Sequence, residues 1–408
     1  MTTINTDLLT PLGAYLRLRG MGRASFLLES VERGRLGRNS WMGAGSRLVT
    51  FEEAEELGLP VIGYLSYDFI AQLEPTVPLP AEGKGFPESR LVVAETLVRF
   101  DHGAGTAEVL AGDPDEIAGR LDGGIPWQRE TRGVAGPIRR FPDRERYEDM
   151  VRRCQQHIVA GDAFQIVPSQ RAERPTSASP LDVYRALRRV NPSPYLFLLD
   201  LDGISLVGSS PERLVACEDG RASLVPIAGT TEPTEGDVER LLSSEKDRAE
   251  HVMLVDLGRN DLSRVCRAGT VHVARSMEVE RFSHVSHLVS EVVGELRDGV
   301  TPFDVLRACF PAGTVSGAPK VRAMQIISEL EGHRRGPYAG AVLYALPGGT
   351  MDTCIALRTI VMADGVAHLQ AGAGIVYDSD PAAEHEECLH KLAALEAAID
   401  LAEQEYAP

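Results

Sequence analysis

Candidate β-strands follow one another in pairs along this chain, with no helix between the members of a pair. The segments SPYLFLLDL (193–201) and GISLVGSS (203–210) are two apolar runs separated by a single aspartate. We interpret them as the two strands of a β-hairpin. Parallel βαβ units would instead alternate strand and helix, so this order predicts an α+β fold with antiparallel sheets.

Other elements follow from local patterns. Strands are expected at residues 23–30, 91–100 and 163–169, and short helices at residues 51–58 and 182–190. Apolar side chains recur at helical spacing from Tyr147, and Gly161 ends that run, which predicts a further helix. Residues 121–142 are rich in Gly, Pro and Arg and indicate a linker. We therefore expect an N-terminal subregion over residues 1–120 and a catalytic region over residues 143–408.

Charge and cysteine usage limit the partners and the compartment. The chain has 408 residues and a formal net charge of −17, which disfavours nucleic acid or an anionic membrane as partner. Its six cysteines are widely spaced and form no C-x-x-C pair, as is typical of reduced thiols. The start, MTTINTDLL, lacks the pattern of a signal peptide, and no apolar run is long enough to span a membrane. We expect a cytoplasmic protein.

Two candidate helices carry carboxylates beside apolar stripes. Glu250 leads a stripe that continues through Met253, Leu254 and Leu257 at helical spacing.

The second helix begins at Asp380–Pro381, an N-cap followed by proline. There Glu384, Glu387 and Lys391 lie within about 60° of one another around the helix axis. Further along, the same side of this helix becomes apolar. We therefore expect these acids at the edge of the core.

A carboxylate in that position needs a cation, since an unpaired buried charge costs several kcal/mol. Carboxylates from separate helices favour a hard ion such as Mg²⁺. The alternative is a solvated first turn in which acids interact with the helix dipole.

A pocket for a small anion is indicated near the sequence SHVSHLVSE. His284 and His287 lie in a valine-rich run that alternates like a strand, and Thr314 and Ser316 lie in a glycine-rich turn that opens a helix. A polar side chain on an apolar strand, together with N–H groups at a helix start, can bind an anion. The alternative for His287 is an ordinary strand histidine with satisfied hydrogen bonds.

The motif FPAGTVSGAPKVRAM, at residues 310–324, resembles the signature of chorismate-utilising enzymes, in particular anthranilate synthase component I. Further matching motifs follow the family order, among them GYLSYD, GDAFQIVPSQR, GSSPERLV, DRAEHVMLVDLGRND, AGAGIVYDSDP and EHEECLHK. The resemblance implies an α/β sandwich of two large antiparallel sheets with helices outside and the active site between the sheets. In this fold the N-terminal and catalytic regions are interwoven in one globular unit.

The resemblance also implies roles for individual residues. Glu212 matches the general acid beside the departing ring hydroxyl, and His287 matches the base that takes the C2 proton. Arg358 and Tyr338 match a clamp on the enolpyruvyl carboxylate. The other matching residues are the Mg²⁺ carboxylates Glu250 and Glu387, their supporting acids Asp247 and Glu384, Thr314 over the ring, and the substrate-binding positions Gly229, Thr230, Gly372, Ala373, Gly374 and Lys391.

Two positions narrow the chemistry. Gln165 stands where isochorismate and salicylate synthases carry a lysine base, and glutamine cannot activate water in that way. Ala228 stands where many aminodeoxychorismate synthases carry a nucleophilic lysine. Ammonia attack at C2 remains, giving 2-amino-2-deoxyisochorismate and then anthranilate and pyruvate, the reaction of a lyase. The alternatives are a synthase of aminodeoxyisochorismate or aminodeoxychorismate, or a non-catalytic regulatory partner that binds tryptophan.

The expected partners follow from the same resemblance. No glutaminase motif is present, so the ammonia should come from a glutamine amidotransferase subunit, component II, and the assembly should be oligomeric. The segments LLES and NPSPYLF resemble a feedback site for tryptophan, whose pathway the chain would serve, unless it serves secondary metabolism. That regulatory site would comprise Leu28, Glu29, Ser30, Pro194, Tyr195 and Leu196.

Overall fold

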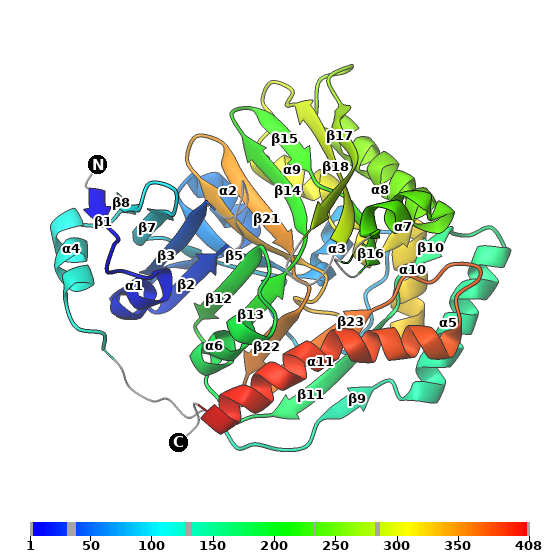
Figure 1. Cartoon of the computed structure of the whole chain (residues 1–408), viewed down its shortest axis with the longest axis horizontal. Coiled ribbons are helices and arrows are strands. Elements are labelled where there is room, and N and C mark those ends of the chain that lie inside the picture. Colours follow the sequence, from blue (N-terminus) through cyan, green and yellow to red (C-terminus); the bar gives the residue numbers. More distant parts are fainter. Residues whose placement is uncertain are drawn as a thin grey trace.

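The computed structural model describes residues 3–30, 38–126, 133–231, 234, 236–281 and 286–405. Two large antiparallel sheets dominate this part of the chain (Figure 1). The expected α+β fold with antiparallel sheets is confirmed. Among the described residues, no helix is both long enough and apolar enough to span a bilayer.

The first sheet is built from both halves of the chain. Its strands in spatial order are β1 (Thr3–Asn5), β8 (Thr106–Ala111), β7 (Thr96–Asp101), β3 (Asn39–Gly45), β2 (Ala24–Glu29), β12 (Tyr195–Leu201), β13 (Ser205–Ser210), β22 (Thr359–Ala363), β23 (Val366–Gly372), β11 (Ser169–Pro175) and β9 (Arg139–Phe141). The predicted hairpin is present as β12 and β13, which pair antiparallel. β9 lies within the predicted linker, so part of that segment is a strand.

The second sheet also mixes distant segments. Its order is β16 (Ile227–Thr231), β18 (Ser286–Glu295), β15 (Arg221–Leu224), β14 (Arg213–Glu218), β21 (Thr350–Ile355), β20 (Ala341–Leu346), β5 (Val61–Leu65), β6 (Ser89–Val93) and β4 (Leu48–Val49), with β17 (His272–Arg281) paired to β18. A short ribbon of β10 (Gln165–Ile166) and β19 (Gly317–Ala318) lies apart from both sheets.

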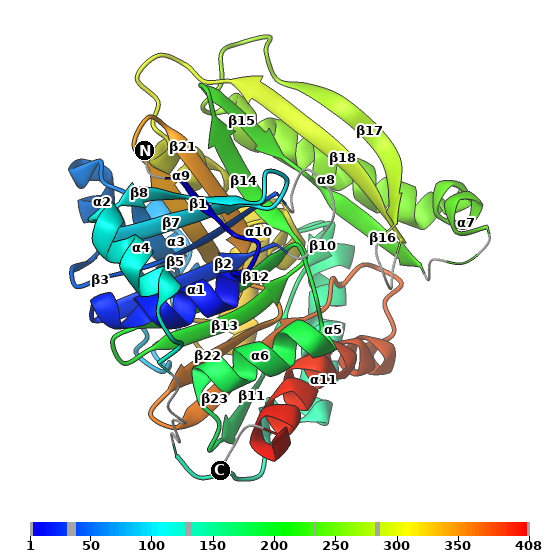
Figure 2. The same ribbon diagram turned by 60° about the vertical axis from the view of Figure 1, so that its left-hand side comes forward.

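Three apolar layers explain why the sheets stack. A central cluster joins Phe26 and Phe197 of the first sheet to Tyr64 and Val342 of the second. A second cluster packs the first sheet against its helices, and a third packs the second sheet against other helices. Figures 1 and 2 show these helices outside the sheets. Burying both faces of each sheet is the main source of stability for such an arrangement.

The helices fall into two groups. Those that pack beside the first sheet are α1 (Pro11–Leu18), α4 (Pro114–Asp122), α6 (Pro180–Val190) and α11 (Pro381–Glu405). The others are α2 (Phe51–Leu57), α3 (Ile70–Leu73), α5 (Arg144–Val159), α7 (Asp237–Ser243), α8 (Glu245–Ser263), α9 (Pro302–Cys309) and α10 (Lys320–Glu331), with short 3₁₀ turns η1 (Arg19–Met21), η2 (Tyr67–Phe69) and η3 (Gly313–Val315).

Capping residues set two helix starts that matter for the site. Asp380 accepts a hydrogen bond of 2.8 Å from the backbone N–H of Ala383, which confirms the predicted start of α11. Ser179 caps α6, and that helix therefore begins at Pro180, two residues earlier than expected.

Two predicted strands are wrong in detail. The single strand expected at residues 91–100 is two strands, because the chain leaves the second sheet after Val93 and enters the first at Thr96. The strand expected at residues 163–169 is only the two-residue β10 followed by the start of β11. Pro168 separates them, and proline has no N–H to continue a ladder.

Candidate active site

His287 is the second residue of β18 and lies opposite Thr230 of β16. Its Nδ1 is 3.0 Å from the carbonyl oxygen of Gly229. A carbonyl only accepts hydrogen bonds, so Nδ1 carries the proton and Nε2 keeps a lone pair when the ring is neutral. Burial lowers the pKa of His287, although the Gly229 carbonyl opposes that shift. The ring is therefore neutral at pH 7 and can accept a proton.

Gly229 needs to be glycine. Its φ is +66°, and the pairing of β16 with β18 shifts register beside it. A Cβ at this position would lie 3.2 Å from side-chain atoms of Leu241 and Asp247. The Gly229 backbone therefore lies close to Leu241 of α7 and Asp247 of α8, while its carbonyl oxygen contacts His287. For Thr230 the structure describes the backbone pairing alone, and His284 lies outside the described residues.

Glu212 and Thr314 come from different elements and meet. Glu212 lies between β13 and β14, and the Thr314 hydroxyl in η3 donates a hydrogen bond of 3.1 Å to its Oε1. Burial raises the pKa of Glu212 to about 8, against the opposing effects of Thr314 and Lys391. The carboxyl group thus retains its proton at pH 7 and can act as a general acid. Both residues line a small cavity together with Leu254 and Leu257 of α8.

Gln165 ties the β10–β19 ribbon to α8. Its Nε2 donates a hydrogen bond of 3.1 Å to Oε1 of Glu250, and its side chain is buried. A Cβ added to Gly374 would lie only 2.8 Å from that nitrogen. The absence of a side chain at Gly374 is therefore what lets the amide reach Glu250.

Lys391, on α11, connects a helix acid to the end of β23. Its Nζ lies 2.7 Å from Oε1 of Glu387 and 2.8 Å from the carbonyl oxygen of Gly372. The hydroxyl of Tyr338 lies close by, since a Cβ on Gly372 would be 3.1 Å from it. The next residue, Ala373, is fully buried and donates its N–H to Pro168.

Arg358 is a half-buried cation in the turn between β21 and β22, at a φ of +48°. Its guanidinium makes no hydrogen bond or ion pair with another residue that the structure describes. Burial lowers the pKa of this group, with Tyr338 and Glu387 acting in the opposite direction. A planar guanidinium that forms no hydrogen bond with a described residue, near a tyrosine, is suited to bind a carboxylate.

The four predicted metal acids differ in exposure. Glu250, Asp247 and Glu384 are half-buried, whereas the Glu387 side chain is 51% exposed. Glu387 is thus the most exposed of the four, and it pairs with the partly buried Lys391 at the edge of the helix–sheet contact. Within the described ranges, no group of three or more Asp, Glu, His or Cys side chains is arranged to hold a metal.

The donor chemistry still fits Mg²⁺. Glu250 and Glu387 offer hard carboxylate oxygens, each of which is held by a single neutral or cationic side chain, Gln165 or Lys391. Mg²⁺ is commonly held by one or two carboxylates and completes its octahedron with water and substrate oxygens. A complete all-protein cluster is not required for such a site.

The predicted tryptophan segments lie side by side. In the pairing of β2 with β12, Leu196 is opposite Glu29 and Phe197 is opposite Leu28. The carboxylate of Glu29 is buried and already accepts hydrogen bonds from Tyr184 and Arg188.

Two other features of this region were not expected from the sequence. Ser30 Oγ is buried without a hydrogen-bond partner among the described residues. The hydroxyl of Tyr195 accepts a hydrogen bond of 2.8 Å from Arg213, which pairs with Asp352 at 3.1 Å, while Pro194 is buried next to it. No short motif links Arg213 to Asp352, since they become neighbours only where β14 pairs with β21.

Comparison with known proteins gives one consistent result. The family model described as chorismate binding enzyme matches residues 25–397. The chain is 43% identical to anthranilate synthase component 1 of Thermus thermophilus, over 98% of this chain and 97% of that protein. It is 44% identical to anthranilate synthase component 1 of Streptomyces coelicolor, over 97% of this chain and 88% of that protein.

Solved structures agree with the sequence matches. Anthranilate synthase component I of Streptococcus pneumoniae superposes with a TM-score of 0.78 at 34% identity, covering 96% of this chain and 98% of that one. The menaquinone-specific isochorismate synthase of Escherichia coli superposes with a TM-score of 0.77 at 22% identity, covering 98% and 94%. The second match shows a shared fold alone.

Proposed function

The chain belongs to the chorismate-binding enzyme family, and from this membership and the geometry of the site we propose that it is the synthase component of an anthranilate synthase. It converts chorismate and ammonia into anthranilate and pyruvate. One observation carries the assignment of roles: the pKa of Glu212 is raised and the pKa of His287 is lowered, so an acid and a base coexist in their active forms at pH 7.

In the first stage ammonia attacks C2 of chorismate and the ring hydroxyl leaves as water. Glu212 supplies the proton to that hydroxyl, and Thr314 holds the Oε1 oxygen in place. The nitrogen loses a proton on becoming an amine, so the overall change is chorismate plus ammonia giving 2-amino-2-deoxyisochorismate plus water. Gln165 cannot remove a proton from water, which favours ammonia as the nucleophile.

In the second stage Nε2 of His287 takes the C2 proton while the enolpyruvyl group leaves C3 and gains a proton to become pyruvate. The ring becomes aromatic. The Gly229 carbonyl fixes the tautomer that leaves Nε2 free of hydrogen. Arg358 and Tyr338 would hold the enolpyruvyl carboxylate, while the backbone at Gly372, Ala373 and Gly374 and the Lys391 ammonium would line the same end of the site.

Glu250 and Glu387 would hold Mg²⁺, with Asp247 and Glu384 supporting them, and the ion would stabilise negative charge on the ring carboxylate. The residues of this chain do the remaining work of orienting the substrate and moving protons.

Partners and regulation extend the proposal. A glutamine amidotransferase subunit, component II, would supply the ammonia within an oligomeric assembly. Tryptophan would bind at the β2–β12 junction, where the Ser30 hydroxyl, which has no hydrogen-bond partner among the described residues, offers a hydrogen-bonding group for an amino acid. All six cysteines are unpaired and buried, which supports a reducing compartment, the cytoplasm.

Product identification tests the proposal. The purified chain is mixed with chorismate, Mg²⁺ and an ammonium salt at mildly alkaline pH. The products are separated by chromatography and identified by mass spectrometry. Anthranilate with an equal amount of pyruvate is the expected result. An amino product that retains the enolpyruvyl group would assign the chain to a synthase that stops at the intermediate. No turnover of chorismate would refute the catalytic assignment and favour a regulatory partner.

A further inference from the structure

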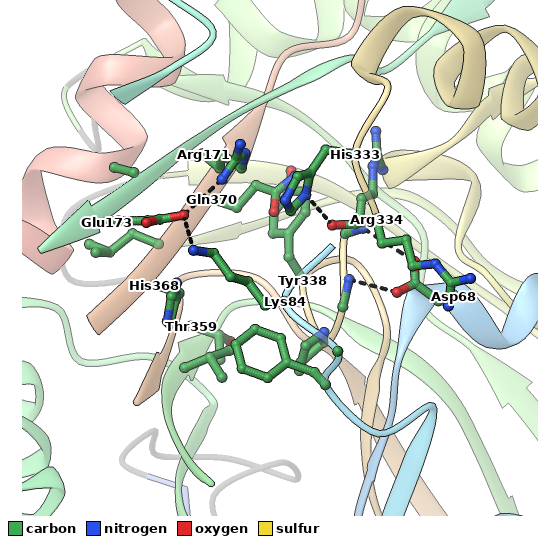
Figure 3. A pocket seen from close by; sticks show the side chains of 18 residues that line it. Asp68, Lys84, Arg171, Glu173, His333, Arg334, Tyr338, Thr359, His368 and Gln370 are labelled. Atoms are coloured by element: carbon green, nitrogen blue, oxygen red, sulfur yellow. Dashed lines mark hydrogen bonds and ion pairs between the residues drawn. The ribbon is translucent and has the colours of Figure 1, made fainter. Parts of the chain in front are cut away.

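A second cavity lies outside the proposed chorismate site (Figure 3). It encloses about 580 Å³ when the space open to solvent at its mouth is included. Its walls come from four separate segments, residues 84–86, 171–173, 333–338 and 359–370, together with Asp68. None of the charged residues that line these walls has a role in the reaction proposed above.

Cations converge on one wall of the cavity. The Nζ of Lys84 and the Nη1 of Arg171 each lie 2.8 Å from Oε1 of Glu173, and Figure 3 shows these two side chains directed at the same carboxylate. Burial tends to raise the pKa of Glu173, but Lys84 and Arg171 outweigh it and the pKa is lowered. On this wall, one buried carboxylate therefore contacts two cations.

The opposite wall adds two further cations, Arg334 and Arg335, and one carboxylate, Asp68. Arg334 lies near Asp68, whose two carboxylate oxygens already accept the backbone N–H groups of Arg335 and Gly336 at 3.2 and 3.1 Å. The cavity lining thus holds more positive than negative charge, in a chain whose formal net charge is −17. Such a local surplus attracts a small anion.

The remaining wall is apolar and aromatic. The rings of Phe86 and His368 meet edge to face with centroids 5.3 Å apart, next to Val361 and Leu369. Burial lowers the pKa of His368 to about 4, and Lys84 and Arg171 act in the same direction, so this ring is neutral at pH 7. A flat apolar group would have an aromatic surface to pack against.

Tyr338 belongs to this cavity and to the catalytic region. Its side chain lines the cavity, and its hydroxyl lies beside Gly372, which accepts the hydrogen bond from Lys391. Arg335 stacks over the Tyr338 ring at 5.5 Å and is anchored to Glu331 at 2.6 Å. The Tyr338 side chain therefore borders both sites.

We propose that this cavity is a second binding site, selective for a small ring-bearing carboxylate, and that its occupancy acts on the catalytic site through Tyr338. A free amino acid fits less well, because its ammonium group would enter a positively charged cavity. The carboxylate could be the aromatic product or a second molecule of the substrate. The binding claim stands on the cavity alone, whereas the effect on catalysis rests on the proposed function.

Calorimetric titration with benzoate tests the binding claim without any turnover. We expect two sites on the wild-type chain, one on Lys84→Met, one on Arg358→Met and none on the double variant. Arg267→Met is the matched control, because Arg267 is exposed and pairs with the exposed Asp298, and it should keep two sites. Arg171→Met provides a second test of the same cavity. Retention of both sites in Lys84→Met and Arg171→Met, or a single wild-type site that Arg358→Met removes, would overturn the proposal.

Initial rates distinguish the source of the carboxylate. Inhibition by added anthranilate and inhibition by excess chorismate are each measured in the wild type and in Lys84→Met. Loss of the first in the variant identifies the product as ligand, and loss of the second identifies the substrate. If both inhibition patterns are unchanged, the link to catalysis is refuted. If the wild type shows no turnover at all, the proposed function fails, and the calorimetric result still decides the binding claim.

Discussion

The hydroxyl of Thr314 lies 3.1 Å from Oε1 of Glu212, although 102 positions separate the two residues in the sequence. The contact joins the 3₁₀ turn before α10 to the loop between two strands of different sheets. It holds a carboxyl group whose pKa burial raises to about 8. The arrangement stores a proton where the leaving hydroxyl of the substrate would lie.

Glu212→Gln should abolish synthesis and stabilise the fold at neutral pH. An acid whose pKa is raised on folding binds a proton that the unfolded chain releases, so stability falls as pH rises from about 4.5 to about 8. Glutamine does not titrate, and the variant should gain roughly 3 kcal/mol at pH 7. Denaturant unfolding at pH 5 and pH 8 measures this. An equal gain at both pH values would contradict the assigned pKa.

The rate of the reaction should fall at alkaline pH. At a constant concentration of uncharged ammonia, kcat/KM should decline as Glu212 loses its proton near pH 8. On the acid side the rate should persist below the ordinary pKa of histidine, because burial lowers the pKa of His287 and keeps the ring neutral. Rates measured across this range with the ammonium concentration adjusted at each pH provide the test. A rate that keeps rising through pH 9 would exclude Glu212 as the acid.

His287→Ala should uncouple the two stages. Anthranilate output should fall by about 10²-fold or more, while 2-amino-2-deoxyisochorismate accumulates, because the base for the C2 proton is missing. His272→Ala is the matched control, since His272 is exposed on the neighbouring strand β17. Chromatography of both products decides the outcome. Unchanged anthranilate release from His287→Ala would remove the residue from the mechanism.

Glu387→Ala should abolish both activity and the response to Mg²⁺. Its neighbour Glu386 is also exposed on α11 but pairs with Arg144 at 3.2 Å, so Glu386→Ala should retain both. Each variant is titrated with Mg²⁺. Calorimetry measures binding of the ion, and initial rates measure its effect on the reaction. Wild-type Mg²⁺ binding in Glu387→Ala would refute the ligand assignment.

Gly374→Ala should lower activity by on the order of 10-fold to 100-fold through misplacement of Gln165. The added methyl would stand 2.8 Å from the Gln165 amide nitrogen and push it from Glu250. Gly119→Ala, on α4, is the control, since a Cβ there meets nothing within 4 Å. Steady-state rates and thermal unfolding of both variants are compared. Full activity in Gly374→Ala would show that the Gln165–Glu250 contact is dispensable.

Local rules predicted the elements whose causes are local. The cap at Asp380 and the hairpin of β12 and β13 depend on residues within a few positions, and both are present. The family motifs predicted that Glu212 and Thr314 belong to one site, but the hydrogen bond between them was not expected.

Long-range packing decided the rest. Nothing in residues 91–100 indicates that the chain changes sheets between Val93 and Thr96, because the change depends on which partner strand each half meets. The exposure of Glu387 depends on what lies against α11, and periodicity alone does not specify that. The second cavity has no contiguous motif, since Lys84, Arg171 and His368 become neighbours only in the folded sheets.

The place of β5 in the second sheet has a consequence for how the protein is made. One edge of β5 pairs with β6, which follows it closely, but the other pairs with β20 at residues 341–345. During translation the amino-terminal end of the chain leaves the ribosome long before that partner strand is made. The hydrogen-bonding groups on that edge of Val61–Leu65 therefore stay open through most of synthesis, when a nascent chain is most exposed to wrong pairing.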